Sequence, residues 1–87
     1  MDKTIYSATY VRFLHLLRQF REQAGLTQVE LAQRLHTTQS FISKCERGDR
    51  RIDVVELQAF CAALGISLIQ FVETLEAQAP RPHDTST

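Results

Sequence analysis

Glycine and proline are scarce in this chain of 87 residues, with only three and two copies. The glycines are Gly25, Gly48 and Gly65, and each stands where a helical segment is expected to stop. Both prolines lie near the C-terminus, and no hairpin dipeptide or sustained alternation of apolar and polar residues occurs. These absences exclude a strand-rich protein, and we expect an all-α fold.

Cysteine is also rare, and its two copies, Cys45 and Cys61, show no metal-binding pattern. Neither belongs to a C-x-x-C pair, and no histidine lies three to five residues from either. Since both occupy apolar helix positions, we expect small buried hydrophobic residues rather than redox sensors. The sequence therefore predicts neither a metal site nor a cofactor.

Long apolar runs and catalytic signatures are absent as well. No run approaches the roughly 20 apolar residues that cross a membrane, and Met1–Tyr10 lacks the layout of a signal peptide. The chain has no Ser/His/Asp set, no glycine-rich phosphate loop and no acidic metal cluster. We expect a cytoplasmic protein that is not an enzyme.

Basic residues are missing from the segment between Ile52 and Pro80, which carries four acidic residues. The segment between Arg34 and Arg51 has five basic residues and two acidic ones, a balance of +3. Although the net charge of the whole chain is zero, we expect a local basic patch at this segment, and such a patch can bind phosphate.

Five helices are predicted from the spacing of apolar residues and from three sets of capping residues. Thr27 with Glu30, Asp53 with Glu56 and Ser67 with Gln70 each mark a helix start, and each cap contributes about 1 kcal/mol. The helices are expected at about 8–24, from 28 to the turn at 36, at 38–47, 53–64 and 67–76. The expected inner residues of the first four helices are Phe13, Leu17, Phe20, Ala24, Leu31, Leu35, Phe41 or Ile42, Cys45, Leu57, Phe60, Cys61 and Leu64. The last helix has the apolar residues Leu68, Phe71, Val72 and Leu75. One domain at 1–76 and a disordered tail at 77–87 follow from this pattern.

The segment between Thr27 and Gly48 carries the functional signal. Two short helices are joined by a tight link at His36-Thr37, and Ala32 is small enough for a close crossing. With Ile42 and Cys45 turned inward, the second helix is left with a polar face consisting of Gln39, Ser40, Ser43, Lys44 and Arg47. Hydrogen-bonding groups on a rigid helix are what reading the major groove of DNA requires. Taken alone, the same face is equally consistent with ordinary solvated surface.

The segment resembles the helix-turn-helix of phage repressors and Cro proteins, the Xre family. The residues that carry the resemblance are Arg21, Leu26-Thr27-Gln28, Glu30-Leu31-Ala32, Thr37-Thr38-Gln39-Ser40, Ile42-Ser43, Glu46-Arg47-Gly48 and Ala63-Leu64-Gly65-Ile66-Ser67. The likeness extends from about Phe13 to Leu75 and implies a five-helix repressor-like domain.

The resemblance implies a role for each matching residue. Gln39, Ser40, Ser43 and Lys44 would face base edges, with Gln39 suited to adenine. Gln28, Thr38, Arg47, Arg50 and Arg51 would contact phosphates. Arg21 and Glu46 would form a structural ion pair between the first and third helices. Where the family has glycine in the turn this chain has His36, so a positive φ is predicted there.

The last helix is rich in apolar residues on more than one face, and it predicts a homodimer. Ile69, Val72 and Leu75 are the candidate interface residues, because paired recognition helices would reach successive major grooves. The alternative is that the first helix, with Tyr6, Tyr10, Leu14 and Leu16 near its start, covers this surface within one chain.

The expected function is sequence-specific binding of double-stranded DNA by a transcription regulator, with the helix at about 38–47 in the major groove. Two alternatives remain open at this stage. An antitoxin of this fold would bind a toxin and also its own promoter, and a restriction–modification controller protein would be a further kind of regulator.

Overall fold

The computed structural model describes residues 7–78, and this part of the chain forms five helices and no strand. The helices are α2 (Ala8–Gln23), α3 (Gln28–Arg34), α4 (Gln39–Arg47), α5 (Val54–Leu64) and α6 (Leu68–Gln78). The predicted all-α class is confirmed. Helix α6 extends two residues past position 76, and the tail predicted at 77–87 lies outside the described residues from position 79 onward.

The helix starts follow from their caps. Thr27 and Asp53 each form a complete capping box, in which the cap side chain accepts a backbone N–H and the glutamate three residues later accepts the cap's own N–H. The Ser67 hydroxyl accepts the N–H of Gln70 at 2.9 Å. Thr38 caps α4 by accepting the N–H of Phe41. Thr38, Asp53 and Ser67 are thus caps, and the helices begin one residue after each of them.

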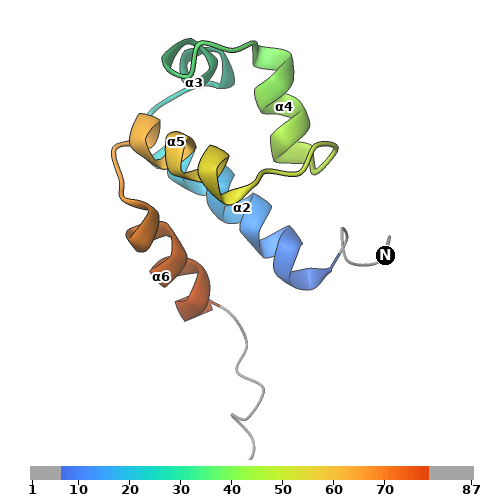
Figure 1. Cartoon of the computed structure of the whole chain (residues 1–87), viewed down its shortest axis with the longest axis vertical. Helices are drawn as coiled ribbons and strands as arrows, with labels where there is room; N and C mark the ends of the chain where they lie inside the picture. Colours follow the sequence, from blue (N-terminus) through green and yellow to red (C-terminus); the bar gives the residue numbers. More distant parts are fainter. Residues whose placement is uncertain (1–6, 79–87) are drawn as a thin grey trace, which may run out of the picture.

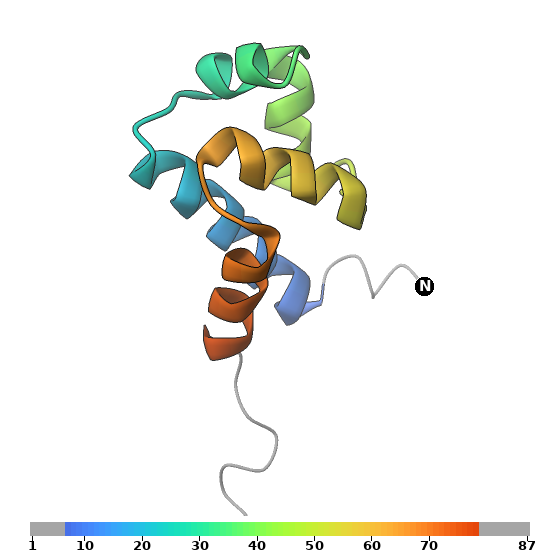
Figure 2. The same ribbon diagram turned by 60° about the vertical axis from the view of Figure 1, so that its left-hand side comes forward.

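The helix pair α3–α4 and the helix α6 lie at opposite ends of the molecule, with α2 and α5 between them (Figures 1 and 2). Helices α3 and α4 pack together at one end, α6 lies at the other, and α2 contacts both α4 and α6. Helix α5 crosses between them, and a bend of 103° separates it from α6. In the described part of the chain no single helix is long and apolar enough to span a membrane. Helices α5 and α6 have that length and composition only when taken together, and they are bent relative to each other.

Every one of the five helices contributes buried side chains to the core. The most deeply buried side chains are Leu17, Leu31, Ile42, Cys45, Phe60, Cys61 and Phe71. Ala32 is 3% exposed, as expected where α3 crosses α4. The ring of Phe71 lies 5.6 Å from those of both Phe13 and Phe20, which fastens α6 to α2.

One predicted inner residue is exposed, and one buried apolar residue of α2 was not among those predicted. Ala24 is exposed because it is the C-cap of α2, beyond its last turn. On α6, Phe71 occupies the inward position, and Val72 beside it is 42% exposed, so of Val72 and Leu75 it is Val72 that core packing leaves uncovered together with Ile69. Leu16 is buried together with Leu17, since α2 is covered on two sides by α4 and α6. Of the pair left open on α4, Ile42 is the buried residue and Phe41 is half-buried.

The turn between α3 and α4 contains a left-handed residue, as predicted. His36 has φ 56°, and it is the only non-glycine residue with positive φ among residues 7–78. Replacing His36 with glycine is expected to stabilise the fold by a few tenths to about 1 kcal/mol, because glycine adopts this conformation without strain. Urea denaturation measures the change. The control is Thr37→Gly in the same turn, which is expected to destabilise, and equal effects of the two variants would contradict the argument.

Candidate nucleic-acid interface

Helices α3 and α4 form a compact helix-turn-helix unit. In the turn, the N–H of Thr37 donates to the carbonyl of Ala32 at 2.9 Å, and that of His36 donates to Gln33 at 3.2 Å. Leu31 on α3 and Ile42 on α4 are both fully buried. Because backbone hydrogen bonds and packing both restrain the turn, α4 is held rigidly against α3 with one face turned outward.

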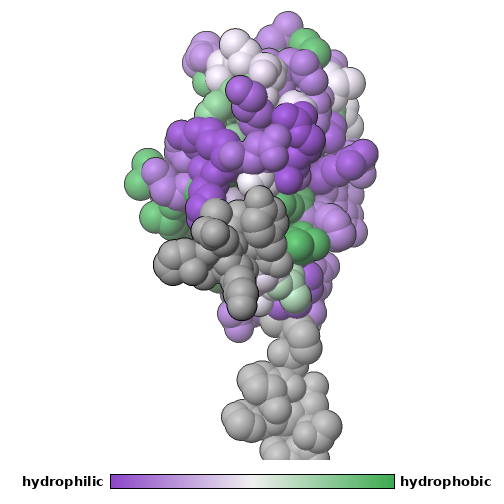
Figure 3. All heavy atoms as spheres, turned by 90° about the vertical axis from the view of Figure 1, so that its right-hand side faces the viewer, coloured by the Kyte–Doolittle hydropathy of each residue, from purple (hydrophilic) through white to green (hydrophobic). Residues whose placement is uncertain are grey.

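The outward face of α4 is polar. Gln39, Ser40, Lys44 and Arg47 are exposed, and Ser43 is half-buried. Figure 3 views the side of the molecule where α4 lies, and a band of hydrophilic residues crosses the middle of this face. The structure therefore brings the predicted base-contacting residues together on one accessible surface.

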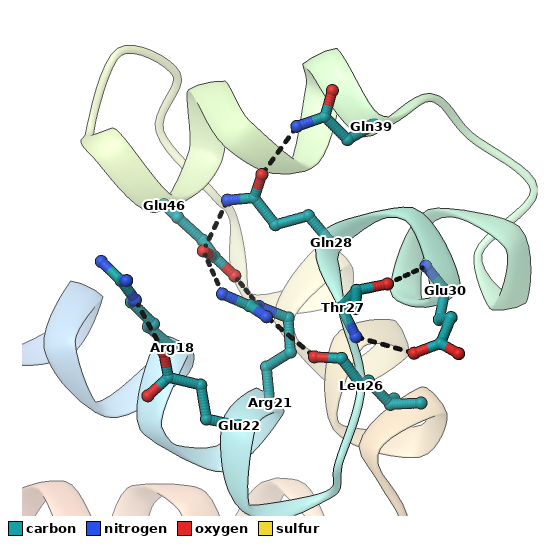
Figure 4. A network of polar contacts seen from close by, with 9 residues as sticks. All are labelled: Arg18, Arg21, Glu22, Leu26, Thr27, Gln28, Glu30, Gln39 and Glu46. Carbon is teal, nitrogen blue, oxygen red and sulfur yellow. Dashed lines mark hydrogen bonds and ion pairs between the residues drawn. The ribbon is translucent and has the colours of Figure 1, made fainter.

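A chain of polar contacts runs from the core to this surface (Figure 4). Arg21 donates from Nε to Glu46 Oε2 at 2.6 Å and from Nη2 to Oε1 at 3.1 Å. Arg21 Nη1 also donates to the carbonyl of Leu26 at 2.8 Å. The Arg21 and Glu46 side chains are only 9% and 5% exposed. The ion pair expected from the sequence is thus present, and it joins α2 to α4.

The chain of contacts continues through two glutamines. Gln28 Nε2 donates to Glu46 Oε1 at 2.9 Å, and Gln39 Nε2 donates to Gln28 Oε1 at 2.8 Å. The Gln39 amide is therefore exposed and oriented at the same time. Its Oε1 and its second N–H have no part in this chain, so they are available to a base edge as an acceptor and a donor.

Sequence reasoning had assigned Gln28 only a phosphate contact and missed this link. The available signal was the position of the two glutamines, each at the first residue of its helix. Gln28 uses one N–H and its oxygen within the chain, which leaves its second N–H for another partner.

The arginines predicted to contact phosphate have different surroundings. Arg47 forms an exposed ion pair with Asp49 at 2.9 Å and also donates to the Ser43 hydroxyl. Arg50 donates two hydrogen bonds to Glu56, at 3.0 and 2.8 Å, and these bonds lower the pKa of the Glu56 carboxyl.

Two basic residues near α4 keep an uncompensated charge. Within residues 7–78, no carboxylate lies within 4 Å of the charged groups of Lys44 or Arg51. The Arg51 guanidinium lies instead over the ring of Tyr10, 4.5 Å from its centre. The basic patch expected from the charge balance is therefore partly neutralised within the chain: Arg47 and Arg50 have carboxylate partners, whereas Lys44 and Arg51 have none among residues 7–78, nor does Arg34, which donates to the carbonyl of Ala63.

Both cysteines lie in the core as free thiols, 0% and 1% exposed. Burial raises the pKa of both Cys45 and Cys61 above its usual value, so they remain neutral thiols at physiological pH. The described residues contain no group of three or more His, Cys, Asp or Glu side chains that could hold a metal ion.

A family model described as a helix-turn-helix domain matches residues 12–71. The chain belongs to this family. The matched residues nearly coincide with the stretch from about Phe13 to Leu75 that resembles the Xre family in sequence. A solved structure of an XRE-family like protein confirms this resemblance.

Two solved structures resemble this helix-turn-helix chain over most of its length. An XRE-family like protein from Pseudomonas syringae pv. tomato str. DC3000 is 46% identical, with a TM-score of 0.80, over 91% of this chain and 96% of that one. The clp gene regulator ClgR from C. glutamicum is 26% identical, with a TM-score of 0.73, over 86% and 99%.

A curated relative, an uncharacterised HTH-type transcriptional regulator from Sinorhizobium fredii (strain NBRC 101917 / NGR234), is 38% identical over 52 residues. These residues make up 60% of this chain and 68% of the relative.

Proposed function

We propose that the protein is a regulator that reads a specific sequence of duplex DNA with α4 in the major groove. As a member of the helix-turn-helix family with regulators among its relatives, it is a DNA-binding regulator of transcription. The observation that carries the finer proposal is the exposed but oriented amide of Gln39, held by Gln28 at 2.8 Å. The proposal involves no catalytic step and no cofactor.

The proposed base contacts are made from the outward face of α4, by Gln39, Ser40, Ser43 and Lys44. Gln39 can donate to N7 and accept from N6 of adenine, and this bidentate pairing discriminates among bases. Ser43 is the weakest candidate, since it is half-buried and accepts a hydrogen bond from Arg47.

The proposed phosphate contacts are Gln28, Thr38, Arg47, Arg50 and Arg51. The Thr38 hydroxyl accepts the N–H of Phe41, so its own hydrogen is free to donate. Arg50 and Arg47 would have to share their guanidinium groups between a carboxylate and a phosphate. Arg51 has no such competitor among residues 7–78 and is expected to contribute most.

We further propose that the protein binds as a homodimer through α6. Ile69 is 69% exposed and Val72 is 42% exposed, whereas Leu75 is half-buried and packs against the core. Helix α2 covers the Phe71 side of α6 through Phe13 and Phe20, and it leaves Ile69 uncovered. The interface would therefore centre on Ile69 and Val72, with Leu75 at its edge.

A toxin partner is not favoured, because one similar protein is described as a transcriptional regulator and another as a gene regulator. A protein that acts on chromosomal DNA works in the compartment that holds it, and we propose the cytoplasm as its location.

Replacing Gln39 with alanine is expected to weaken binding to the preferred duplex by about 1–3 kcal/mol and to relax the preference at one base pair. The preferred duplex would first be selected from random DNA, and fluorescence anisotropy would measure the affinity. Gln19→Ala is the matched control, since Gln19 is an exposed glutamine on α2. If Gln39→Ala changes neither affinity nor base preference, α4 is not the reading helix.

A further inference from the structure

The two neighbouring arginines after α4 both lie over an aromatic ring, Arg50 over Phe41 at 4.8 Å and Arg51 over Tyr10, but only Arg50 is also bound at its edges. The Arg50 guanidinium is occupied at its edges by Glu56 and by the carbonyl of Arg51. The Arg51 guanidinium lies over the Tyr10 ring, with its central carbon 4.5 Å from the ring centre. A guanidinium stacked on a ring keeps its N–H groups free at the edge, and those groups are the ones that bind a phosphate.

The ring beneath Arg51 is itself fixed to the core. Tyr10 stacks on Phe13, with ring centres 5.2 Å apart and planes 27° apart. Phe13 in turn meets the buried ring of Phe71 edge-on, at 5.6 Å. The platform under Arg51 is therefore a row of aromatic rings that begins in the first turns of α2 and ends in α6.

We propose that Tyr10 is a positioning residue for DNA binding, because its ring holds the Arg51 guanidinium ready for a backbone phosphate. A free arginine side chain loses rotational freedom when it is fixed against a phosphate, and a stacked one has already lost part of it. The contact is made to the backbone, so it strengthens binding to every sequence alike. This inference rests on the proposed DNA binding and adds to it a residue outside the helix-turn-helix.

The test is a double-mutant cycle in DNA affinity. Tyr10→Leu is expected to weaken binding roughly two- to fivefold per subunit, on the selected duplex and on random DNA alike. In the R51A background the same substitution is expected to cause no further loss. Tyr10→Phe is expected to bind as the unchanged protein does, because the Tyr10 hydroxyl is buried without a hydrogen-bond partner and the ring remains.

A second variant avoids any disturbance of the core. Arg51 is exposed, so Arg51→Lys keeps the charge and removes only the flat guanidinium. Arg51→Lys alone is expected to weaken DNA binding by about the same factor as Tyr10→Leu alone. Adding Tyr10→Leu to Arg51→Lys is expected to cause no further loss of affinity. Arg51→Ala is expected in addition to reduce the slope of log affinity against log salt by about 1 per subunit.

The proposal is overturned if Tyr10→Leu weakens DNA binding by the same factor in the otherwise unchanged protein and in the R51A background. It is also overturned if Tyr10→Leu leaves the affinity of the otherwise unchanged protein as it was. A merely structural role for Tyr10 would give the first of these results. The Gln39→Ala measurement on the same duplex separates this failure from failure of the proposed function, since it tests DNA reading without involving Tyr10.

Discussion

Replacing Glu46 with alanine is expected to destabilise the folded protein by about 3 kcal/mol or more, the largest change in stability predicted for this chain. The substitution leaves the Arg21 guanidinium buried without its carboxylate, and an unpaired buried charge is strongly unfavourable. It also removes the partner of Gln28 Nε2. A small domain has only about 5 kcal/mol of stability to lose, so the transition in urea should shift markedly or disappear.

The double variant R21M/E46L separates the charge from the packing. It removes both charges and keeps most of the volume, and we expect it to be more stable than either single alanine variant. Glu22→Ala is the control, because Arg18 and Glu22 form an exposed ion pair, 64% and 55% accessible, whose loss should cost less than about 1 kcal/mol. Additive effects of the Arg21 and Glu46 substitutions would contradict the assignment of a coupled pair.

Replacing Ile69 with glutamate is expected to yield folded monomers that bind the selected duplex at least about tenfold more weakly. A charge at the centre of an apolar interface cannot be paired or solvated there. Without the partner, one recognition helix contacts only a few base pairs, whereas a dimer places two about 34 Å apart on successive turns of the groove. The loss of operator affinity is therefore larger than the loss of any single contact.

Light scattering at micromolar concentration provides the direct measurement. The unchanged protein is expected to have roughly twice the chain mass of 10.0 kDa, and Ile69→Glu to have the mass of one chain. Val55→Glu is the matched control, since Val55 is 70% exposed on α5 and lies outside the proposed interface. A mass near 10.0 kDa for the unchanged protein would refute the homodimer.

Most of the fold follows from short-range signals that are readable in the chain. Thr27 with Glu30 and Asp53 with Glu56 start helices because their bonds join residues three positions apart. Gly48 and Gly65 end helices in the left-handed conformation for an equally local reason. The errors fell where a residue's exposure depends on another helix, as at Leu16, which is buried because α2 is covered on two sides.

The candidate site likewise has features that follow from the sequence and features that depend on the packing of the helices. The polar face of α4 was predictable, because helical periodicity separates Ile42 and Cys45 from Gln39, Ser40 and Lys44. The partners of those polar groups were not. The amide of Gln39 can meet that of Gln28 only after α3 and α4 have packed.

Local chemistry thus determined the five helices, the left-handed turn at His36 and the polar face of α4. Packing decided which basic side chains lack a carboxylate partner, and it gave different results for two adjacent residues. Arg50 is paired with Glu56, whereas the Arg51 guanidinium lies over the Tyr10 ring. Hydrogen bonds and stacking are lost when the groups move apart by about an ångström. Contacts between helices distant in the chain therefore depend on the whole fold, whereas capping bonds depend on one turn.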